Sequence, residues 1–192
     1  KGAKGNLEFA LMADGVAAAD VYATLSTPEG VDRAFAKMDT IKSEVVWWEA
    51  GSQAPQLLAD GEVVMTTAYN GRIFAAAVEE GKPFEIVWDG QIYENEMFVV
   101  PKGAPNMADA MEFVAYATST EGLRASAQQI SYGPARKSSL PLVGKHADKG
   151  VDMQPHMPNA PENSKNAIQI DFKWWADRQE ELNQRWAAWL AK

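Results

Sequence analysis

The 192-residue chain contains no cysteine, so it has neither a disulfide framework nor a thiol for catalysis or metal binding. It has no excess of basic residues either: 18 lysines and arginines face 26 aspartates and glutamates, and the formal net charge is −8. Nucleic acid would be repelled by this charge, whereas a small cationic solute would be attracted. No apolar run approaches the roughly 18 residues that indicate a transmembrane helix, and no signal peptide is recognisable.

Histidine is nearly absent. His146 and His156 stand alone in a polar segment, without the spacing of metal ligands. Neither has a nucleophile beside it in the sequence that it could activate. We therefore expect no catalytic residue, no metal and no cofactor, and an enzyme is the least favoured class of function.

Hydrophobic residues make up 46% of the chain, enough for one sizeable core or two small ones. Apolar spacing and turn residues predict that helices alternate with short strands, which is typical of an α/β fold. The expected helices lie within 7–25, 28–41, 53–59, 70–80, 106–118, 120–129 and 171–191, and the expected strands at 45–48, 63–68, 84–88 and 94–100. Residues 145–165 are expected to form a surface loop with one short helix at most.

Two carboxylates open the last of these strands. Glu94 and Glu96 are two positions apart, so in a strand they would project from the same face. Two like charges so close repel each other, and a cation between or beside them relieves the repulsion. The spacing is equally consistent with a solvated start of a strand.

Four motifs, in order, resemble the extracellular solute-binding proteins of ABC importers, family 1, and among them the spermidine/putrescine-binding branch. The first motif is Gly61-Glu62, followed by an expected strand and then Tyr69-Asn70-Gly71. The second is the acidic segment and strand that precede Pro101-Lys102-Gly103-Ala104-Pro105-Asn106. The third is the turn Tyr132-Gly133-Pro134, and the fourth is the tryptophan-rich tail from Asp171 to Leu190. The resemblance runs through nearly the whole chain.

The resemblance implies a type-2 periplasmic-binding-protein-like α/β fold with two lobes, here incomplete. Nothing in the chain matches the first portion of lobe I. Residues 1–90 would be the main part of lobe II, residues 91–134 the return segment of lobe I, and residues 135–192 the C-terminal part of lobe II. The chain would cross between lobes near 89–93 and 132–139.

The resemblance also implies roles for single residues. Glu96 matches a carboxylate that holds a ligand ammonium, Tyr69 an aromatic residue that packs on ligand methylenes, and Tyr132 a hinge tyrosine that contacts ligand. Glu94 stands where this branch has a tryptophan, so it would supply a second negative charge instead of a stacking ring. Each of the three matched residues has a purely structural alternative.

Further candidates come from the residues themselves. Trp48 and Glu49 end an expected strand, and Trp48 would face the site because Trp47 shares the face of Val45. Ser52 and Gln53 begin a helix, Ser52 as its cap, where free N–H groups could bind a polar ligand group.

The spacing of Trp175, Leu182, Trp186 and Trp189 predicts a packing stripe on a helix, not an aromatic cage for a ligand.

The favoured function is capture of a small cationic solute, most simply a polyamine, by lobe closure in the periplasm, followed by docking on an ABC permease in the membrane. One alternative is an amino acid or other zwitterion, which would use Arg72 or Arg136 for its carboxylate. Another is a ligand-sensing effector domain of a transcription regulator, which can share the two-lobed architecture.

Overall fold

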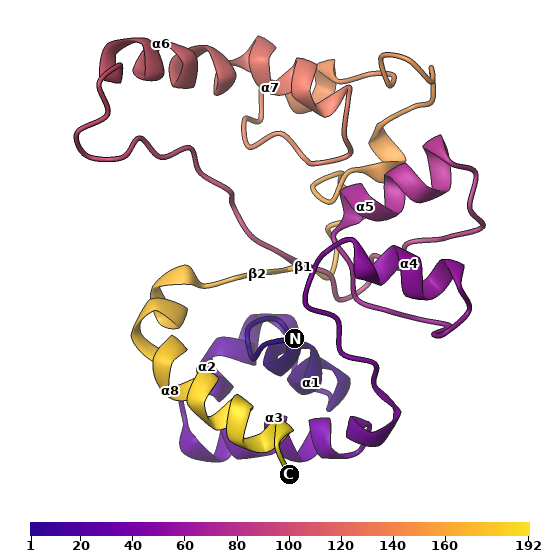
Figure 1. Ribbon diagram of the computed structural model, residues 1–192, viewed down its shortest axis with the longest axis vertical. Coiled ribbons are helices and arrows are strands. Elements are labelled where there is room, and N and C mark those ends of the chain that lie inside the picture. Colours follow the sequence, from indigo (N-terminus) through magenta and orange to yellow (C-terminus); the bar gives the residue numbers. More distant parts are fainter. The chain divides into compact units, whose positions relative to one another are not determined.

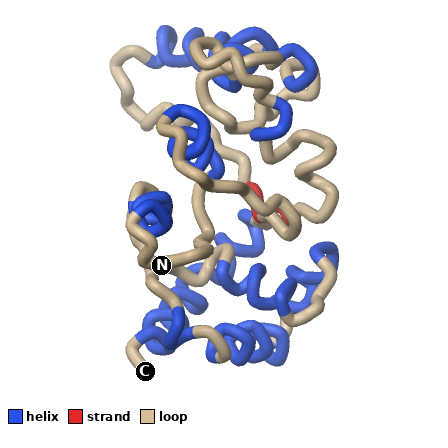
Figure 2. Tube along the Cα trace, turned by 90° about the vertical axis from the view of Figure 1, so that its right-hand side faces the viewer, coloured by secondary structure: helices blue, strands red, loops and turns tan.

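Helices and irregular segments make up almost all of the chain, which the computed structural model describes over residues 1–192 (Figure 2). The chain forms two compact units (Figure 1). Unit 1 comprises Lys1–Ala50, Gly90–Tyr93 and Asn166–Lys192, and unit 2 comprises Gly51–Asp89 and Glu94–Lys165. No helix is long and apolar enough to cross a membrane.

Unit 1 is built from helices that come from both ends of the chain. They are α1 (Asn6–Ala13), a 3₁₀ turn (Ala18–Asp20), α2 (Val21–Leu25), α3 (Pro28–Asp39), a second 3₁₀ turn (Lys42–Glu44) and α8 (Phe172–Leu190). The predicted start of α3 is confirmed: Thr27 is the N-cap, its side chain accepts a hydrogen bond from the Gly30 amide, and Pro28 is the first helical residue. Asp171 caps α8 in the same way.

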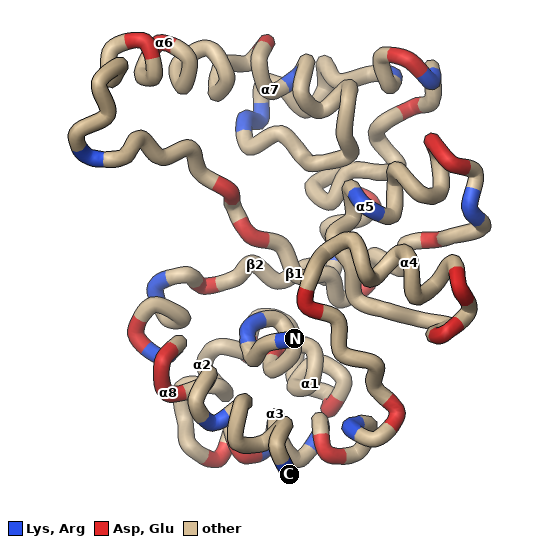
Figure 3. The backbone as a smooth tube through the Cα atoms, in the orientation of Figure 1, with Lys and Arg blue, Asp and Glu red and all other residues tan.

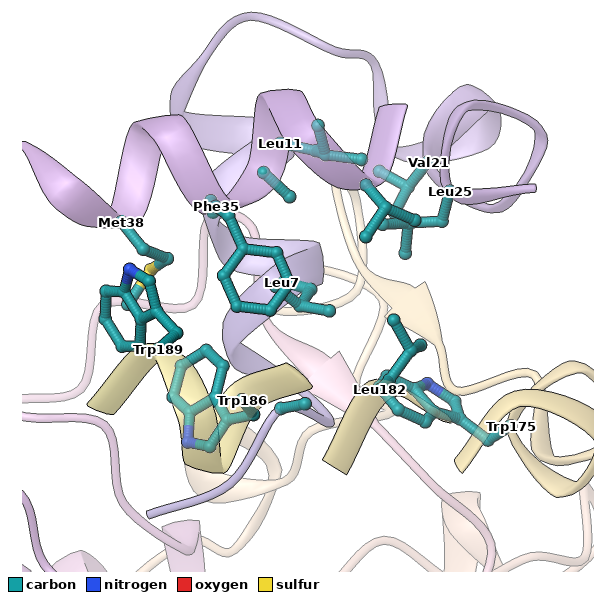
Figure 4. Close-up of a cluster of buried hydrophobic side chains, with 14 of the residues drawn as sticks. Leu7, Leu11, Val21, Leu25, Phe35, Met38, Trp175, Leu182, Trp186 and Trp189 are labelled. Carbon is teal, nitrogen blue, oxygen red and sulfur yellow. The ribbon is translucent and has the colours of Figure 1, made fainter. Parts of the chain in front are cut away.

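The apolar faces of these helices meet in one core (Figure 4). On α8 the buried residues are Trp175, Leu182, Trp186 and Trp189, as their spacing predicted. On α3 the buried side chains repeat at helical spacing, whereas Ile41 lies beyond the helix and is 46% exposed: the buried ones are Val31, Ala34, Phe35 and Met38. Trp47 contributes from outside the helices, with its ring centroid 5.5 Å from that of Trp186. The tryptophan tail is therefore packing, not a ligand site.

One carboxylate lies within this apolar core. Glu8 is fully buried, and three donors surround it: the Trp175 indole N–H at 2.6 Å, the Tyr22 hydroxyl at 2.9 Å and the Gly5 amide at 2.8 Å. Burial raises the pKa of the Glu8 carboxyl above its usual value, although these hydrogen bonds act in the opposite direction. Glu8 thus ties α1 to α2 and α8 through polar contacts that the sequence pattern did not reveal.

Unit 2 contains α4 (Gln53–Ala59), α5 (Asn70–Phe74) continued by a π-helical turn (Ala75–Glu79), α6 (Met107–Ala117), α7 (Thr120–Ala127) and two 3₁₀ turns (Leu140–Leu142 and Gln154–His156). Its small core is made of Phe74, Ala127, Val143, Met153, Met157 and Ala160. The loop 145–165 holds one short 3₁₀ turn, as expected. The π-helical turn completes the helix expected over 70–80.

His146 stabilises the core of unit 2. Its ring stacks on Phe74 with centroids 5.6 Å apart, and its Nδ1 accepts the amides of Asp148 and Lys149 at 3.2 and 3.1 Å. An Nδ1 that accepts two N–H groups carries no proton, so the Nε2–H faces the Gln129 carbonyl at 3.2 Å. His146 therefore has a structural role.

The expected strands are the main error of the sequence analysis. Residues 45–48, 63–68, 84–88 and 94–100 form no regular secondary structure and pair with no neighbour, and Val45–Trp48 is not buried. Burial still alternates along 84–88, as in a strand with one covered face. A strand requires a second segment for its backbone N–H and C=O groups, and this chain offers none to these segments.

The observed sheet is a single parallel pair within unit 1. Strand β1 (Ile92–Tyr93) pairs with β2 (Ile168–Gln169), with Ile92 opposite Ile168. The chain passes between the units on either side of Gly90–Tyr93, where the first crossing was expected, whereas 132–139 lies inside unit 2. The lobe boundaries at 90 and 134 stay a prediction, because the compact units are not an assignment of lobes.

Candidate functional site

Three ionisable side chains of unit 2 lie close enough to Tyr132 to influence the pKa of its hydroxyl. The pKa of the Tyr132 hydroxyl is raised, first by partial burial and then by the negative charge of Glu96, while the Arg72 guanidinium lowers it and Tyr69 raises it. Tyr132 and Tyr69 are 40% and 54% exposed. The structure thus places three predicted site residues, Glu96, Tyr69 and Tyr132, in one neighbourhood and adds Arg72.

A polar clamp holds the two tyrosines in place. Asn70 begins α5, and its side-chain amide donates to the carbonyl of Ser131 at 2.7 Å and to its hydroxyl at 3.2 Å. Ser131 is fully buried. Tyr69 precedes Asn70 and Tyr132 follows Ser131. These hydrogen bonds therefore hold the backbone of the two tyrosines in a fixed relative position.

Arg72 is a candidate that the sequence suggested only for the alternative, zwitterionic ligand. It projects from α5, is exposed, and forms no ion pair within the chain, whereas Arg33, Arg124 and Arg185 each contact a carboxylate. An unpaired guanidinium beside a tyrosine hydroxyl suits a ligand carboxylate, which it can bind through two parallel hydrogen bonds.

Arg136, the other arginine considered for a carboxylate, is used differently. Its Nε donates to the backbone carbonyl of Thr118, which links the segment after Tyr132 to the end of α6. Its role is structural in this arrangement.

Glu94 and Glu96 are both exposed on the extended segment that follows β1, where Figure 3 shows acidic positions. Only Glu96 acts on the Tyr132 hydroxyl. Glu94 makes a contact of its own within the chain. The two carboxylates thus have different surroundings, although their spacing suggested a matched pair.

The remaining predicted residues come from the segment that leads into α4. Trp48 and Glu49 belong to unit 1, where Glu49 pairs with the Lys1 ammonium at 3.0 Å. Ser52 and Gln53 are exposed at the first turn of α4 in unit 2, and Ser52 is the N-cap but makes no capping hydrogen bond through its side chain. No group of three or more side chains of the metal-binding types lies together anywhere in the structure.

The comparisons with known proteins identify the family of the chain. The family described as bacterial extracellular solute-binding protein, family 8 of that name where the sequence had suggested family 1, matches residues 1–159. A γ-aminobutyric acid (GABA)-binding protein of Pseudomonas aeruginosa is 50% identical over 192 residues, which are the whole of this chain and 53% of that protein.

Solved structures show the same fold. The Atu4243-GABA receptor superposes with a TM-score of 0.75 at 34% identity, covering 100% of this chain and 55% of its own. The periplasmic binding protein AgtB of A. tumefaciens R10, solved with agropinic acid, gives 0.77 at 30% identity, covering 97% and 55%. The type-2 periplasmic-binding-protein-like fold is confirmed, and the chain spans about half the length of these relatives.

These relatives bear names of binding proteins and receptors, which fits the expectation that the chain is not an enzyme. None of them is described as a spermidine or putrescine binder, so the comparisons leave that branch unsupported. The match over residues 1–159 covers most of the sequence, and on that ground the chain belongs to the bacterial extracellular solute-binding proteins.

Proposed function

We propose that the chain is part of the periplasmic solute-binding component of an ABC importer, and that its ligand is a small ω-amino acid such as GABA. The observation that carries this proposal is the pair of opposite charges around Tyr132, the Arg72 guanidinium and the Glu96 carboxylate. A ligand with an ammonium at one end and a carboxylate at the other matches both. Two relatives of this chain carry GABA in their names, which supports an ω-amino acid as the class of ligand.

Each side chain has a defined role in this proposal. Arg72 binds the ligand carboxylate, Glu96 binds its ammonium, and the Tyr69 and Tyr132 rings cover the methylenes between them. Tyr69 and Tyr132 also offer hydroxyls to the charged ends. Glu94, Trp48, Glu49, Ser52 and Gln53 stay proposals of lower rank, because none of them is among the groups that influence the pKa of the Tyr132 hydroxyl.

A polyamine is the second candidate, and it rests on the net charge of −8 together with Glu96. A diamine has no group for Arg72 and would place an ammonium near that guanidinium, at a cost in electrostatic repulsion. We therefore rank it below the ω-amino acid.

Two substitutions in the full-length protein separate the two ligands. We expect Arg72→Gln to weaken GABA binding by about tenfold or more, the effect of losing a hydrogen bond to a charged group of at least about 1.5 kcal/mol. The same variant should bind putrescine no more weakly than the wild type. Isothermal titration calorimetry measures both, and Arg178→Gln, a change in α8 of unit 1, is the matched control.

Glu96→Gln gives the complementary result. It should weaken GABA and putrescine alike by about tenfold, because both ligands present an ammonium. Unchanged GABA affinity in both variants would remove the charge pair from the site. Tighter binding of putrescine than of GABA by the wild type would favour the polyamine.

A further inference from the structure

Each site tyrosine lies on a glycine. A Cβ atom at Gly51 would stand 2.8 Å from both Cδ2 and Cε2 of the Tyr69 ring. A Cβ at Gly71 would stand 2.9 Å from Cζ of Tyr132 and 3.1 Å from Cδ1 of Ile130. Ordinary van der Waals contact begins at 3.4 Å, so in both places any side chain would force the ring to move.

The backbone does not require glycine at these two positions. Eight glycines of the chain have a positive φ, which strains other residues, but Gly51 and Gly71 are not among them. Gly71 moreover lies inside α5, where alanine is the better helix former. What excludes a side chain here is therefore the tyrosine ring and not the local conformation.

Two other crowded glycines, Gly30 and Gly122, have a different neighbourhood. Cβ atoms at Gly30 and Gly122 would collide with the backbone carbonyls of Thr24 and Tyr116, at 1.8 and 2.3 Å. Backbone atoms cannot yield, so these glycines serve helix packing. At Gly51 and Gly71 the first obstacle is the outer part of an aromatic side chain, which can rotate away without unfolding the helix.

We propose that Gly51 and Gly71 are positioning residues that set how far the Tyr69 and Tyr132 rings stand off the backbone, and that they thereby select the length of the ligand. The proposal deepens the proposed function and rests on it. A ring lying directly on a glycine leaves room on its exposed face. The methyl group of an alanine at the same position would push the ring toward that exposed face. The ring would then occupy space that the longer ω-amino acids need and the shorter ones do not.

The position of the ring can be measured without any ligand. In full-length protein labelled with 3-fluorotyrosine, Tyr132→Phe assigns the fluorine resonance of Tyr132. We expect Gly71→Ala to shift that resonance while preserving the melting temperature. Gly2→Ala is the matched control, because a Cβ at Gly2 would meet nothing within 4 Å. A resonance that stays in place in Gly71→Ala would overturn the proposal, whether or not GABA binds.

Selectivity is measured with β-alanine, GABA and 5-aminovalerate, which differ by one methylene each. In Gly71→Ala we expect the ratio of GABA affinity to 5-aminovalerate affinity to rise by about tenfold, the scale of one methylene in a tight site. Gly51→Ala should act likewise through Tyr69. Equal losses for all three ligands would contradict a role in length selection.

A double-mutant cycle shows whether Gly71 acts through the ring. In a Tyr132→Ala background, Gly71→Ala should no longer change the ratio of affinities, because the ring to be displaced is gone. A ratio that still changes there would assign the effect to Ile130 or to α5 itself and overturn the proposal. If the resonance shifts but the wild type binds none of the three ligands, the proposed function fails and the role of Gly71 in placing the ring stands.

Discussion

Glu8→Ala is expected to lower the free energy of unfolding of unit 1 by about 3–5 kcal/mol. The substitution opens a cavity in the core and leaves the donors of Trp175, Tyr22 and Gly5 without their acceptor, and a buried donor that loses its partner costs about 1–3 kcal/mol. Urea unfolding followed by tryptophan fluorescence measures the loss. Glu181→Ala, an exposed change on α8, should stay within about 0.5 kcal/mol of the wild type.

The same carboxyl predicts a pH dependence with a definite sign. Its pKa in the folded chain is raised above the ordinary value of 4.5, so between these two values the folded chain holds a proton that the unfolded chain has released. The contribution of Glu8 to stability is complete below about pH 4.5 and decreases as the pH rises through the folded-state pKa. In Glu8→Gln, this dependence of stability on pH should be absent.

In the urea experiment, equal unfolding midpoints for Glu8→Ala and Glu181→Ala would show that the buried contacts of Glu8 contribute nothing to stability.

Trp186→Ala is expected to cost about 3 kcal/mol of stability and to leave ligand affinity unchanged, because the indole fills the core of unit 1 between Phe35, Trp47 and Trp189. Differential scanning calorimetry and a GABA titration give the two values. A variant that keeps its melting temperature and loses binding would move the tail into the ligand site.

Trp186→Phe is the informative companion variant. The indole N–H of Trp186 is buried without a hydrogen-bond partner, whereas those of Trp174, Trp175 and Trp189 all donate to oxygen atoms. Phenylalanine keeps most of the apolar volume and removes that unsatisfied donor, so the loss from a smaller ring is largely offset. We expect a change of less than about 1 kcal/mol. A loss as large as that of alanine would mean that the N–H is satisfied in solution.

The sequence predicted the elements whose signals are local. The caps Thr27 and Asp171 lie directly before the apolar periodicity they introduce, so the starts of α3 and α8 could be placed from neighbouring residues. The strands expected at 63–68 and 84–88 are wrong, although their composition is typical of strands. Pairing depends on a second segment remote in the sequence, which local composition does not reveal.

The candidate site was predicted in part for a similar reason. Tyr69, Glu96 and Tyr132 came from the resemblance, and Tyr69 and Glu96 both influence the pKa of the Tyr132 hydroxyl. Arg72 was named only for the alternative ligand, because a helix position does not reveal what stands opposite it. The net charge of −8 then favoured a cation as ligand. Net charge describes the whole surface, whereas the proposed site depends on single charges such as the Arg72 guanidinium.

The two-ended construction of unit 1 has a consequence for the time course of folding. Helices α1 to α3 are complete by residue 39, yet α8, which covers their apolar face, starts only at residue 172. At typical synthesis rates of about 5–20 residues per second, the ribosome needs roughly 6 to 30 s for the stretch between them. Unit 2 lies wholly within that interval and can gain its own core first. Docking of α8 then completes unit 1, and since that helix carries four of the seven tryptophans, indole emission reports when this unit closes.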